Sequence, residues 1–534
     1  DGIMVKQSKD LTGGQKVAVA EFFAGRTLVS ATGKFPPPAC EQTGLDLQRP
    51  PSQSGWGVEP ASTRFQAAGT GGLTVDAIPS LELKWAFAFP NAIKARSQPA
   101  VAGGTVFVGS PSGRVYALDA ATGCARWVFR ASAEIRTAIV VSPWDAGDKD
   151  ARPSLYFGDV LARAYSVDAA TGRLNWSTRV DDHPNATITG TPTLVGERLF
   201  VPVSSLEVVA AADPEYACCT FRGSMVALGA DDGGLLWKTY TVDTEPSDAG
   251  KTSVGTTILA PSGAPIWNSP TVDLKRNQIY AGTGENYSSP ADGSSDAIMA
   301  FDMATGKKNW VTQTVSGDAW NAGCLIYFTE DASNCPEENG PDFDFSASPI
   351  LLPLAGDKDI LVVGQKSGIV YGLDPDSGRS LWQTRVGRGG VQGGVHFGMA
   401  VDDQVLYVPM SDFKGGGGTR SGPGERRPGM YALDLASGET LWFTPGADVC
   451  RGRDFCQPGL SAAATAIPGG VVAGAMDGHL RAYERGTGKV LWDFDSAVPF
   501  EALNGNRGQG GSFGGGAGPV FSDGVRFVNS GSGM

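Results

Sequence analysis

One motif occurs seven times along the chain and limits what it can fold into. Each copy predicts a strand of alternating apolar residues, a tight turn with the consensus Asp-x-x-(Thr/Ser)-Gly, and a second strand ending in Trp. A further strand pair precedes each copy, so the repeating unit has four strands, as in the blade of a β-propeller. The copies span residues 113–127, 162–176, 223–237, 296–310, 368–382, 429–442 and 478–492.

The two ends of the repeat region predict how the ring closes. Trp85 lies in the segment LELKWAF, a Trp strand with no unit before it, whereas residues 518–533 contain a strand pair with no Trp strand after it. Paired together, these N- and C-terminal strands would form an eighth blade and hide both sheet edges. We therefore predict an all-β, eight-bladed propeller over residues 61–534. The third to sixth Trp spacings, of 61, 73, 72 and 60 residues, carry insertions that we expect to build the functional face.

Residues 1–60 lack the repeat and are predicted to form an N-terminal extension. Residues 11–26 have the pattern of a short amphipathic helix, and residues 27–60 are rich in Pro, Gly and Ser, which predicts an irregular connector stapled by Cys40. The chain begins at Asp1 without a Met and shows no signal peptide or membrane span, as expected of a mature exported protein.

Composition excludes several functions. The formal net charge of −13 argues against nucleic acid as a partner, and an acidic surface could steer a basic protein or simply keep the chain soluble. Only 3 histidines argue against a histidine-ligated zinc or iron enzyme. The absence of a CxxC spacing excludes a tetrahedral zinc site and CxxCH haem attachment within this chain. The 8 cysteines include three close pairs, which predicts disulfides and a periplasmic or secreted protein.

Several motifs together resemble one enzyme family. The ALDAxTGxxxW repeat, with WGVEPASTRFQ, CCTFRGSMVAL, GTGENYSSP, GDAWNAGC and GQKSG, is similar to dehydrogenases that carry pyrroloquinoline quinone (PQQ), and most similar to their polyvinyl alcohol dehydrogenase branch. The resemblance runs from about Trp56 to the end of the chain. The repeat alone is a weak functional signal, because non-catalytic propeller scaffolds that bind other proteins share it.

The resemblance implies a calcium ion beside the cofactor, held by a glutamate and an asparagine. Glu207 follows the small-residue run that begins at Ser204 and is the first candidate, although it could also be an exposed strand-end carboxylate. After the Gly-Thr-Gly turn this chain has Glu285 in place of the family's asparagine, with Asn286 behind it. A carboxylate is a good ligand for a hard cation, so Ca²⁺ is kept as a cofactor, with Glu285 or Asn286 as the second ligand.

The family stacks PQQ between an indole and a disulfide of adjacent cysteines. Trp267 is the implied indole, unless it is an ordinary core tryptophan. Cys218 and Cys219 are the implied disulfide, with two buried thiols as the alternative. Adjacent Cα atoms lie about 3.8 Å apart, below the usual disulfide range of about 4.4–6.8 Å, so such a bond is rare and its presence would be informative.

The remaining site residues also come from the resemblance. Lys366 matches the basic residue that binds the quinone oxygens. Thr189 and Arg136 match residues that hold the cofactor carboxylates, and Arg96 is a weaker candidate. Each of these could instead be a polar residue at a blade end facing water.

The resemblance also implies a catalytic base. Register places Asn321 where the family has its aspartate, but an amide cannot accept a proton from an alcohol. Asp318, one short turn earlier, is the available carboxylate and our predicted base, with an Asx-type turn residue as the alternative.

The implied activity is oxidation of a secondary alcohol, such as a polymer, polyol or bulky alcohol, by hydride transfer to PQQ. Electrons would pass to a soluble cytochrome c. Residues 1–26 look like the tail of a cytochrome c-like domain, with Met4 where an axial ligand could have been, or else form a docking helix. A non-catalytic propeller scaffold is the alternative function.

Overall fold

The structure is a computed structural model, and it describes residues 12, 15, 37–53, 55–90, 92, 94–325, 331–413, 422–453, 456–505 and 507–531. The helix expected at residues 11–26, apart from Thr12 and Gln15, lies outside the described residues, as does Met4. No helix in the described part of the chain is both long and apolar enough to cross a membrane.

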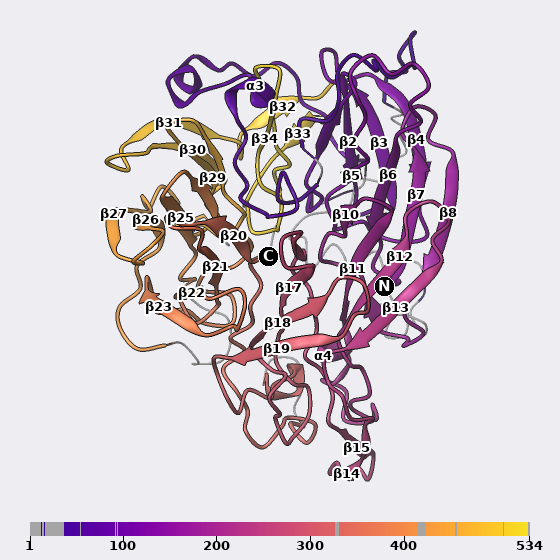
Figure 1. The fold of residues 1–534 in the computed structure, drawn as a ribbon, viewed down its shortest axis with the longest axis vertical. Coiled ribbons are helices and arrows are strands. Elements are labelled where there is room, and N and C mark those ends of the chain that lie inside the picture. The colour runs from indigo at the N-terminus through magenta and orange to yellow at the C-terminus, as the bar shows by residue number, and fades with distance from the viewer. Residues whose placement is uncertain are drawn as a thin grey trace.

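Seven antiparallel sheets follow one another along the chain and lie around a common centre (Figure 1). Within each sheet four strands pair in chain order, as the repeat predicts. The first four sheets are β1 (Ala100–Ala102), β2 (Thr105–Gly109), β3 (Arg114–Asp119) and β4 (Ala125–Arg130); β5 (Val140–Val141), β6 (Ser154–Gly158), β7 (Arg163–Asp168) and β8 (Leu174–Arg179); β10 (Thr193–Val195), β11 (Arg198–Ser205), β12 (Ser224–Gly229) and β13 (Leu235–Tyr240), with β9 (Ala186–Thr187) also pairing with β11; and β16 (Thr271–Asp273), β17 (Gln278–Gly282), β18 (Ala297–Asp302) and β19 (Lys308–Gln313).

Three further sheets, three hairpins and four short helices complete the described chain. The sheets are β20 (Ile350–Pro353), β21 (Asp359–Gly364), β22 (Ile369–Leu373) and β23 (Ser380–Arg385); β24 (Ala400–Asp402), β25 (Val405–Met410), β26 (Gly429–Asp434) and β27 (Thr440–Pro445); and β28 (Thr465–Ile467), β29 (Gly470–Gly474), β30 (His479–Glu484) and β31 (Val490–Asp495). The hairpins are β14 (Ser247–Lys251) with β15 (Thr257–Ala260), β32 (Pro499–Glu501) with β33 (Arg507–Gln509), and β34 (Val520–Ser522) with β35 (Val525–Phe527). The α-helices are α3 (Ala68–Gly71) and α4 (Glu207–Ala210), and the 3-10 helices are η1 (Val75–Ser80) and η2 (Ala322–Cys324).

The repeat tryptophans fasten each sheet to the next one. Each of the seven lies in the fourth strand of its sheet, and five of them donate Nε1–H to a turn carbonyl of the following unit, as Trp127 does to Ala169 at 3.1 Å. The turn glycine allows this contact: Gly172 has φ +72°, and a Cβ there would lie 2.7 Å from the Trp127 ring. The tryptophans therefore serve packing between blades, as the sequence predicts.

The closing blade is less complete than predicted. Trp85 donates to the carbonyl of Ala120 at 3.2 Å, the same bond that five repeat tryptophans make, and the centre of its ring lies 6.0 Å from that of Phe527. Strand β34 contacts β1. However, residues 81–89 form no strand, and β34 and β35 pair only with each other, so the predicted ladder between the N- and C-terminal strands is not formed in the described chain. The fold is all-β and of propeller type.

Residues 52–66 cross the inner strands and tie the sheets together. Their main chain bonds to Val101, Val272, Leu351, Val401 and Ala466, which lie in five different inner strands. Within this segment the fully buried Arg64 donates to the carbonyls of Trp56 and Ala464, both at 2.5 Å, and to Gln98 Oε1 at 3.0 Å. The buried Arg64 guanidinium thus links the segment around Trp56 to residues beside the first and the last four-stranded sheets.

Candidate functional site

The fold gathers polar side chains at one end of the ring. In each sheet the start of the first strand lies beside the end of the second, because the two strands are antiparallel. Four residues before the first strand come Arg96, Arg136, Thr189, Trp267 and, in the sixth sheet, His396. Two or three residues after the second strand come Glu207, Glu285 and Lys366. Successive sheets therefore each contribute residues to one face.

Three carboxyl groups form a compact buried cluster on this face. Glu285, Asp342 and Asp344 each place an oxygen within 4.8 Å of the others, and each residue is 4% exposed. Lys366 Nζ lies 2.5 Å from Asp342 Oδ1 and 3.2 Å from Asp344 Oδ2, and it is the one ammonium group bonded to the cluster among the described residues. Three carboxylates against one cation suit a hard metal ion such as Ca²⁺, which prefers carboxylate oxygens.

The environment separates the protonation states of these carboxyls. Burial, together with the charges of Asp344 and Asp342, raises the pKa of Glu285 well above its usual value. Burial likewise raises the pKa of Asp342. Burial acts on Asp344 in the same direction, but the charge of Lys366 and hydrogen bonds hold the pKa of Asp344 below its usual value. The ionised form is therefore most favoured at Asp344.

Asp344 is held by two donors and keeps one oxygen available. Trp267 Nε1 donates to Asp344 Oδ2 at 2.9 Å, and Lys366 lies 5.7 Å from the centre of the Trp267 ring. The other oxygen, Oδ1, is buried and accepts no hydrogen bond from an N–H group or an alcohol hydroxyl of the described chain, and the neighbouring carboxyls of Glu285 and Asp342 hydrogen-bond Asp344. The rings of His396 and Phe397 pack edge-on against the Trp267 indole, with ring centres 6.0 Å and 5.9 Å from its centre. Trp267 is thus a partly exposed ring beside an oriented carboxylate.

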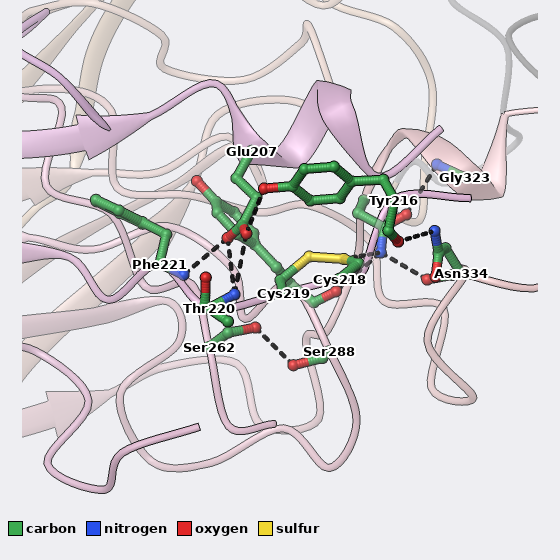
Figure 2. Close-up of a disulfide and its surroundings, with 12 residues drawn as sticks. Glu207, Tyr216, Cys218, Cys219, Thr220, Phe221, Ser262, Ser288, Gly323 and Asn334 are labelled. Carbon is green, nitrogen blue, oxygen red and sulfur yellow. Dashed lines mark hydrogen bonds between the residues drawn. A yellow bond between two sulfur atoms is a disulfide. The ribbon is translucent and has the colours of Figure 1, made fainter. Parts of the chain in front are cut away.

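The adjacent cysteines form a disulfide, and Glu207 supports it. Cys218 and Cys219 are bonded and buried, and the other three disulfides are Cys40–Cys124, Cys324–Cys335 and Cys450–Cys456, so no described cysteine is free. Figure 2 shows the Glu207 carboxylate pointing at the loop that carries this disulfide. It accepts from the Tyr216 hydroxyl at 2.9 Å, from Thr220 N at 3.0 Å and from Phe221 N at 2.8 Å. Burial and the charge of Glu207 raise the pKa of Tyr216, which keeps that hydroxyl a donor.

Glu207 is wholly buried, so the alternative of an exposed strand-end carboxylate is wrong. It does not belong to the three-carboxyl cluster, and its oxygens already accept hydrogen bonds from protein donors. Its role as a metal ligand stays a prediction. Ser204 lies in β11 opposite Thr187, where it is buried, and Asn286 donates from its side chain to the Ser262 carbonyl.

The predicted base and its neighbour have their polar atoms engaged by protein groups. Asp318 is fully buried and accepts from the main-chain N–H groups of Asp342 and Phe343. The Asn321 side chain donates to the carbonyls of Tyr287 and Asn334 and accepts from Gly323 N. It lies 4.0 Å from Cys218 Sγ and belongs to the packing around the disulfide.

Three basic side chains, Lys94, Arg96 and Arg136, lie just before the first strands of the first two sheets. Burial and the charge of Arg136 lower the pKa of Arg96, and burial and both arginines lower that of Lys94. Glu134 is the carboxylate near them, bonded to Arg136 Nη2 at 2.9 Å. Arg136 Nε is buried and has no hydrogen-bond partner among the described residues. Thr189 is the other residue predicted to bind a cofactor carboxylate. It is half-buried and stands four residues before β10, as Arg136 stands four residues before β5. This arrangement suits an anion with more than one carboxylate.

Asp342, Asp344 and His396 were missed by the sequence analysis. His396 stands four residues before β24, which is the register that already singles out Arg136 and Trp267, so applying that register to every sheet would have found it. Asp344 stands six residues and Asp342 eight residues before β20, outside that register, and no signal in the sequence pointed to them.

The chain is similar to known propeller proteins. Residues 54–324 match the family described as "Glucose/ethanol/alcohol dehydrogenase, beta-propeller domain", and residues 338–509 match "Outer membrane protein assembly factor BamB". A polyvinylalcohol dehydrogenase of Pseudomonas sp is 41% identical over 93% of this chain and 75% of its own length. One of Sphingopyxis sp. (strain 113P3) is 39% identical over 92% of this chain and 75% of its own length.

The solved quinohemoprotein alcohol dehydrogenase of Comamonas testosteroni has a TM-score of 0.64, with 19% identity, over 90% of this chain and 76% of that one, which shows the shared fold. The chain therefore belongs to the family of PQQ-dependent propeller alcohol dehydrogenases. Within that family, its curated relatives at 41% and 39% identity are both polyvinylalcohol dehydrogenases.

Proposed function

We propose that this chain oxidises a secondary alcohol, on a polymer, polyol or other bulky molecule, to a ketone in the periplasm. The observation that carries this is the oriented Asp344 carboxylate, held by Trp267 and Lys366 beside two further carboxyl groups. When bound, PQQ supplies the hydride acceptor and Ca²⁺ supplies Lewis-acid polarisation. The curated relatives named polyvinylalcohol dehydrogenase support the substrate class.

The chain's own groups divide the remaining work. We propose that Asp344, rather than Asp318, is the general base, because its Oδ1 is available to accept the substrate hydroxyl proton. Glu285 and Asp342 would hold the cation, with Glu207 as a further predicted ligand if its carboxylate turns from the disulfide loop. Trp267 and the Cys218–Cys219 disulfide would contact the cofactor faces, and Lys366 would bind its quinone oxygens. Arg136, Arg96 and Thr189 would hold its carboxylates.

The partner and the location are proposed on similar grounds. Four disulfides favour an oxidising compartment such as the periplasm. A cytochrome c is the proposed electron acceptor, because a relative 25% identical is named "Lupanine 17-hydroxylase [cytochrome c]" and others are named quinohemoproteins. A chain of net charge −13 would attract a basic acceptor. Residues 1–60 are proposed as an N-terminal extension that precedes the propeller domain in the chain.

We also propose that residues 81–89 belong with β34 and β35 to an eighth blade. Trp85 makes the bond typical of a fourth-strand tryptophan, and residues 81–89 line a cavity of about 990 Å³ together with β35. Phe87 and Phe89 pack with Val520 and Phe527 across it.

Reconstitution tests the proposed function. The protein with PQQ and Ca²⁺ should reduce an artificial dye, and then cytochrome c, with secondary alcohols and short vinyl alcohol oligomers. Primary alcohols of the same size are the matched controls. PQQ binding without dye reduction by any alcohol would refute the proposal, and equal rates with primary alcohols would refute the substrate class.

Arg136→Gln should weaken PQQ binding about tenfold to a hundredfold, because a charge-assisted hydrogen bond contributes about 1.5–3 kcal/mol. Quenching of tryptophan fluorescence by PQQ gives the dissociation constant. Arg173→Gln, at an exposed turn on the second sheet, is the control and should bind as the parent does. An unchanged affinity in Arg136→Gln would remove this residue from the cofactor site.

Ca²⁺ binding should release protons and tighten as pH rises. Glu285 and Asp342 have raised pKa values, so part of each population is protonated and must ionise before it binds a cation. For the same reason these two groups make the metal-free fold bind more protons than the unfolded chain, so their contribution to stability falls as pH rises. Calorimetry in two buffers of different ionisation enthalpy measures the released protons. Binding without proton release would contradict the pKa directions.

A further inference from the structure

Asp318 lies between the two chain segments that carry the clustered carboxyls. It follows β19, and its side chain reaches the segment of Asp342 and Asp344. Its Oδ1 accepts from Asp342 N at 3.2 Å and its Oδ2 accepts from Phe343 N at 2.9 Å. With 0% exposure and a main-chain donor on each oxygen, this carboxylate is built into the protein interior.

The main chain around Asp318 is bonded to the segment that carries Glu285. Asn286 N donates to the Asp318 carbonyl at 3.1 Å, and Trp320 N donates back to the Asn286 carbonyl at 2.8 Å. These two bonds form a parallel bridge between Asn286 and Ala319. On the other side, Gly340 N donates to the Ala319 carbonyl at 2.8 Å. Residues 318–320 therefore connect both carboxyl-bearing segments.

Gly340 shows how closely the segments meet. A Cβ at this glycine would lie 2.0 Å from Asp318 Oδ1 and 2.6 Å from Asp318 Cα. A side chain at position 340 would therefore push the Asp318 carboxylate away from the N–H groups of Asp342 and Phe343. The backbone conformation of Gly340 does not itself require glycine, since its φ is not positive.

We propose that Asp318 is a positioning residue that sets the spacing between Glu285 and the Asp342–Asp344 pair. This inference rests on the proposed function of that cluster as a cation site. The Asp318 carboxylate fixes one carboxyl-bearing segment and its carbonyl fixes the other, so the distance between metal ligands depends on this residue. It acts through the ligands and does not touch the substrate.

Two variants test this independently of turnover. Asp318→Asn places an amide N–H against main-chain N–H groups, and Gly340→Ala displaces an intact Asp318. Both should weaken binding of Ca²⁺ alone, measured by calorimetry, at least tenfold, and after PQQ reconstitution both should lower kcat with little change in the KM of the alcohol. Asp434→Asn, at a turn on β26 far along the chain, is the matched control and should keep the parent affinity. Thermal unfolding and near-ultraviolet circular dichroism check folding, and if Asp318→Asn does not fold, Gly340→Ala decides.

The outcomes separate the inference from the proposed function. Loss of turnover in Asp318→Asn with unchanged Ca²⁺ affinity would make Asp318 a base and overturn the inference. Unchanged Ca²⁺ affinity in a folded Gly340→Ala, or no Ca²⁺ binding by the parent, would also overturn it. A parent protein that binds Ca²⁺ yet oxidises no alcohol refutes the proposed function, and weakened binding in both variants would still support the positioning role.

Discussion

Asp344→Asn should lower kcat about a thousandfold, because removal of a general base typically costs about 10²–10⁴ in rate. Asn has the shape of Asp and keeps an oxygen for the Trp267 and Lys366 donors, but it cannot take the proton of the substrate hydroxyl. The dye-reduction rate with a saturating secondary alcohol measures the effect, and PQQ affinity should change little. The profile of kcat against pH should also lose its acid limb, since Asp344 is the carboxyl whose pKa is held low.

The matched control for this variant is Asp302→Asn, at an exposed turn of the fourth sheet that caps Thr305. It should keep the parent kcat. An Asp344→Asn protein that binds PQQ normally and retains more than about a tenth of the parent kcat would show that another group accepts the proton. Asp342 would then be the next candidate, because it shares Lys366 with Asp344.

The fold could largely be predicted because its determinants are local and repeated. Trp127, Trp176 and their equivalents each follow the same kind of turn and lie in the fourth strand of a sheet, and five of the seven make the same bond to the next unit. The incomplete eighth blade, where the two ends of the repeat region meet, could not be predicted from local sequence in the same way. Whether the Trp85 segment forms a ladder with β35 depends on contacts between chain ends, and no local pattern in either segment encodes that pairing.

The site was predictable only where a side chain falls in the repeating register. Arg136 and Trp267 precede their strands by four residues, and both lie on the face with the carboxyl cluster. Asp344 follows a long insertion and stands six residues before β20, so the spacing that works elsewhere misses it. Asp318 is the carboxylate next to the position where the resemblance expects a base. Its hydrogen bonds to the N–H groups of Asp342 and Phe343 join residues distant in the sequence, so the sequence alone could not show that they occupy its oxygens.

Lys366→Met should be the most destabilising single change at this face. The ammonium group balances three buried carboxyls, and removing one partner of a buried ion pair costs about 3–5 kcal/mol. Burial opposes the charge of Lys366, but the neighbouring carboxylates raise its pKa, so the parent keeps this cation throughout the neutral range. In metal-free protein, denaturant unfolding should show a loss of this size in the free energy of unfolding.

The loss should depend on pH and on Ca²⁺ in a direction that identifies its cause. Without Lys366, the pKa of Asp344 rises, so the folded variant binds more protons than the unfolded chain above the usual carboxyl range. Its stability then falls relative to the parent as pH rises from mildly acidic to neutral. Ca²⁺ supplies a replacement charge and should restore part of the stability at neutral pH. Lys366→Arg, which keeps the charge, is the control and should lose much less. If Lys366→Met is as stable as the parent at neutral pH without Ca²⁺, the three carboxyls are already neutral in the metal-free protein, and Lys366 does not stabilise the fold by pairing with them.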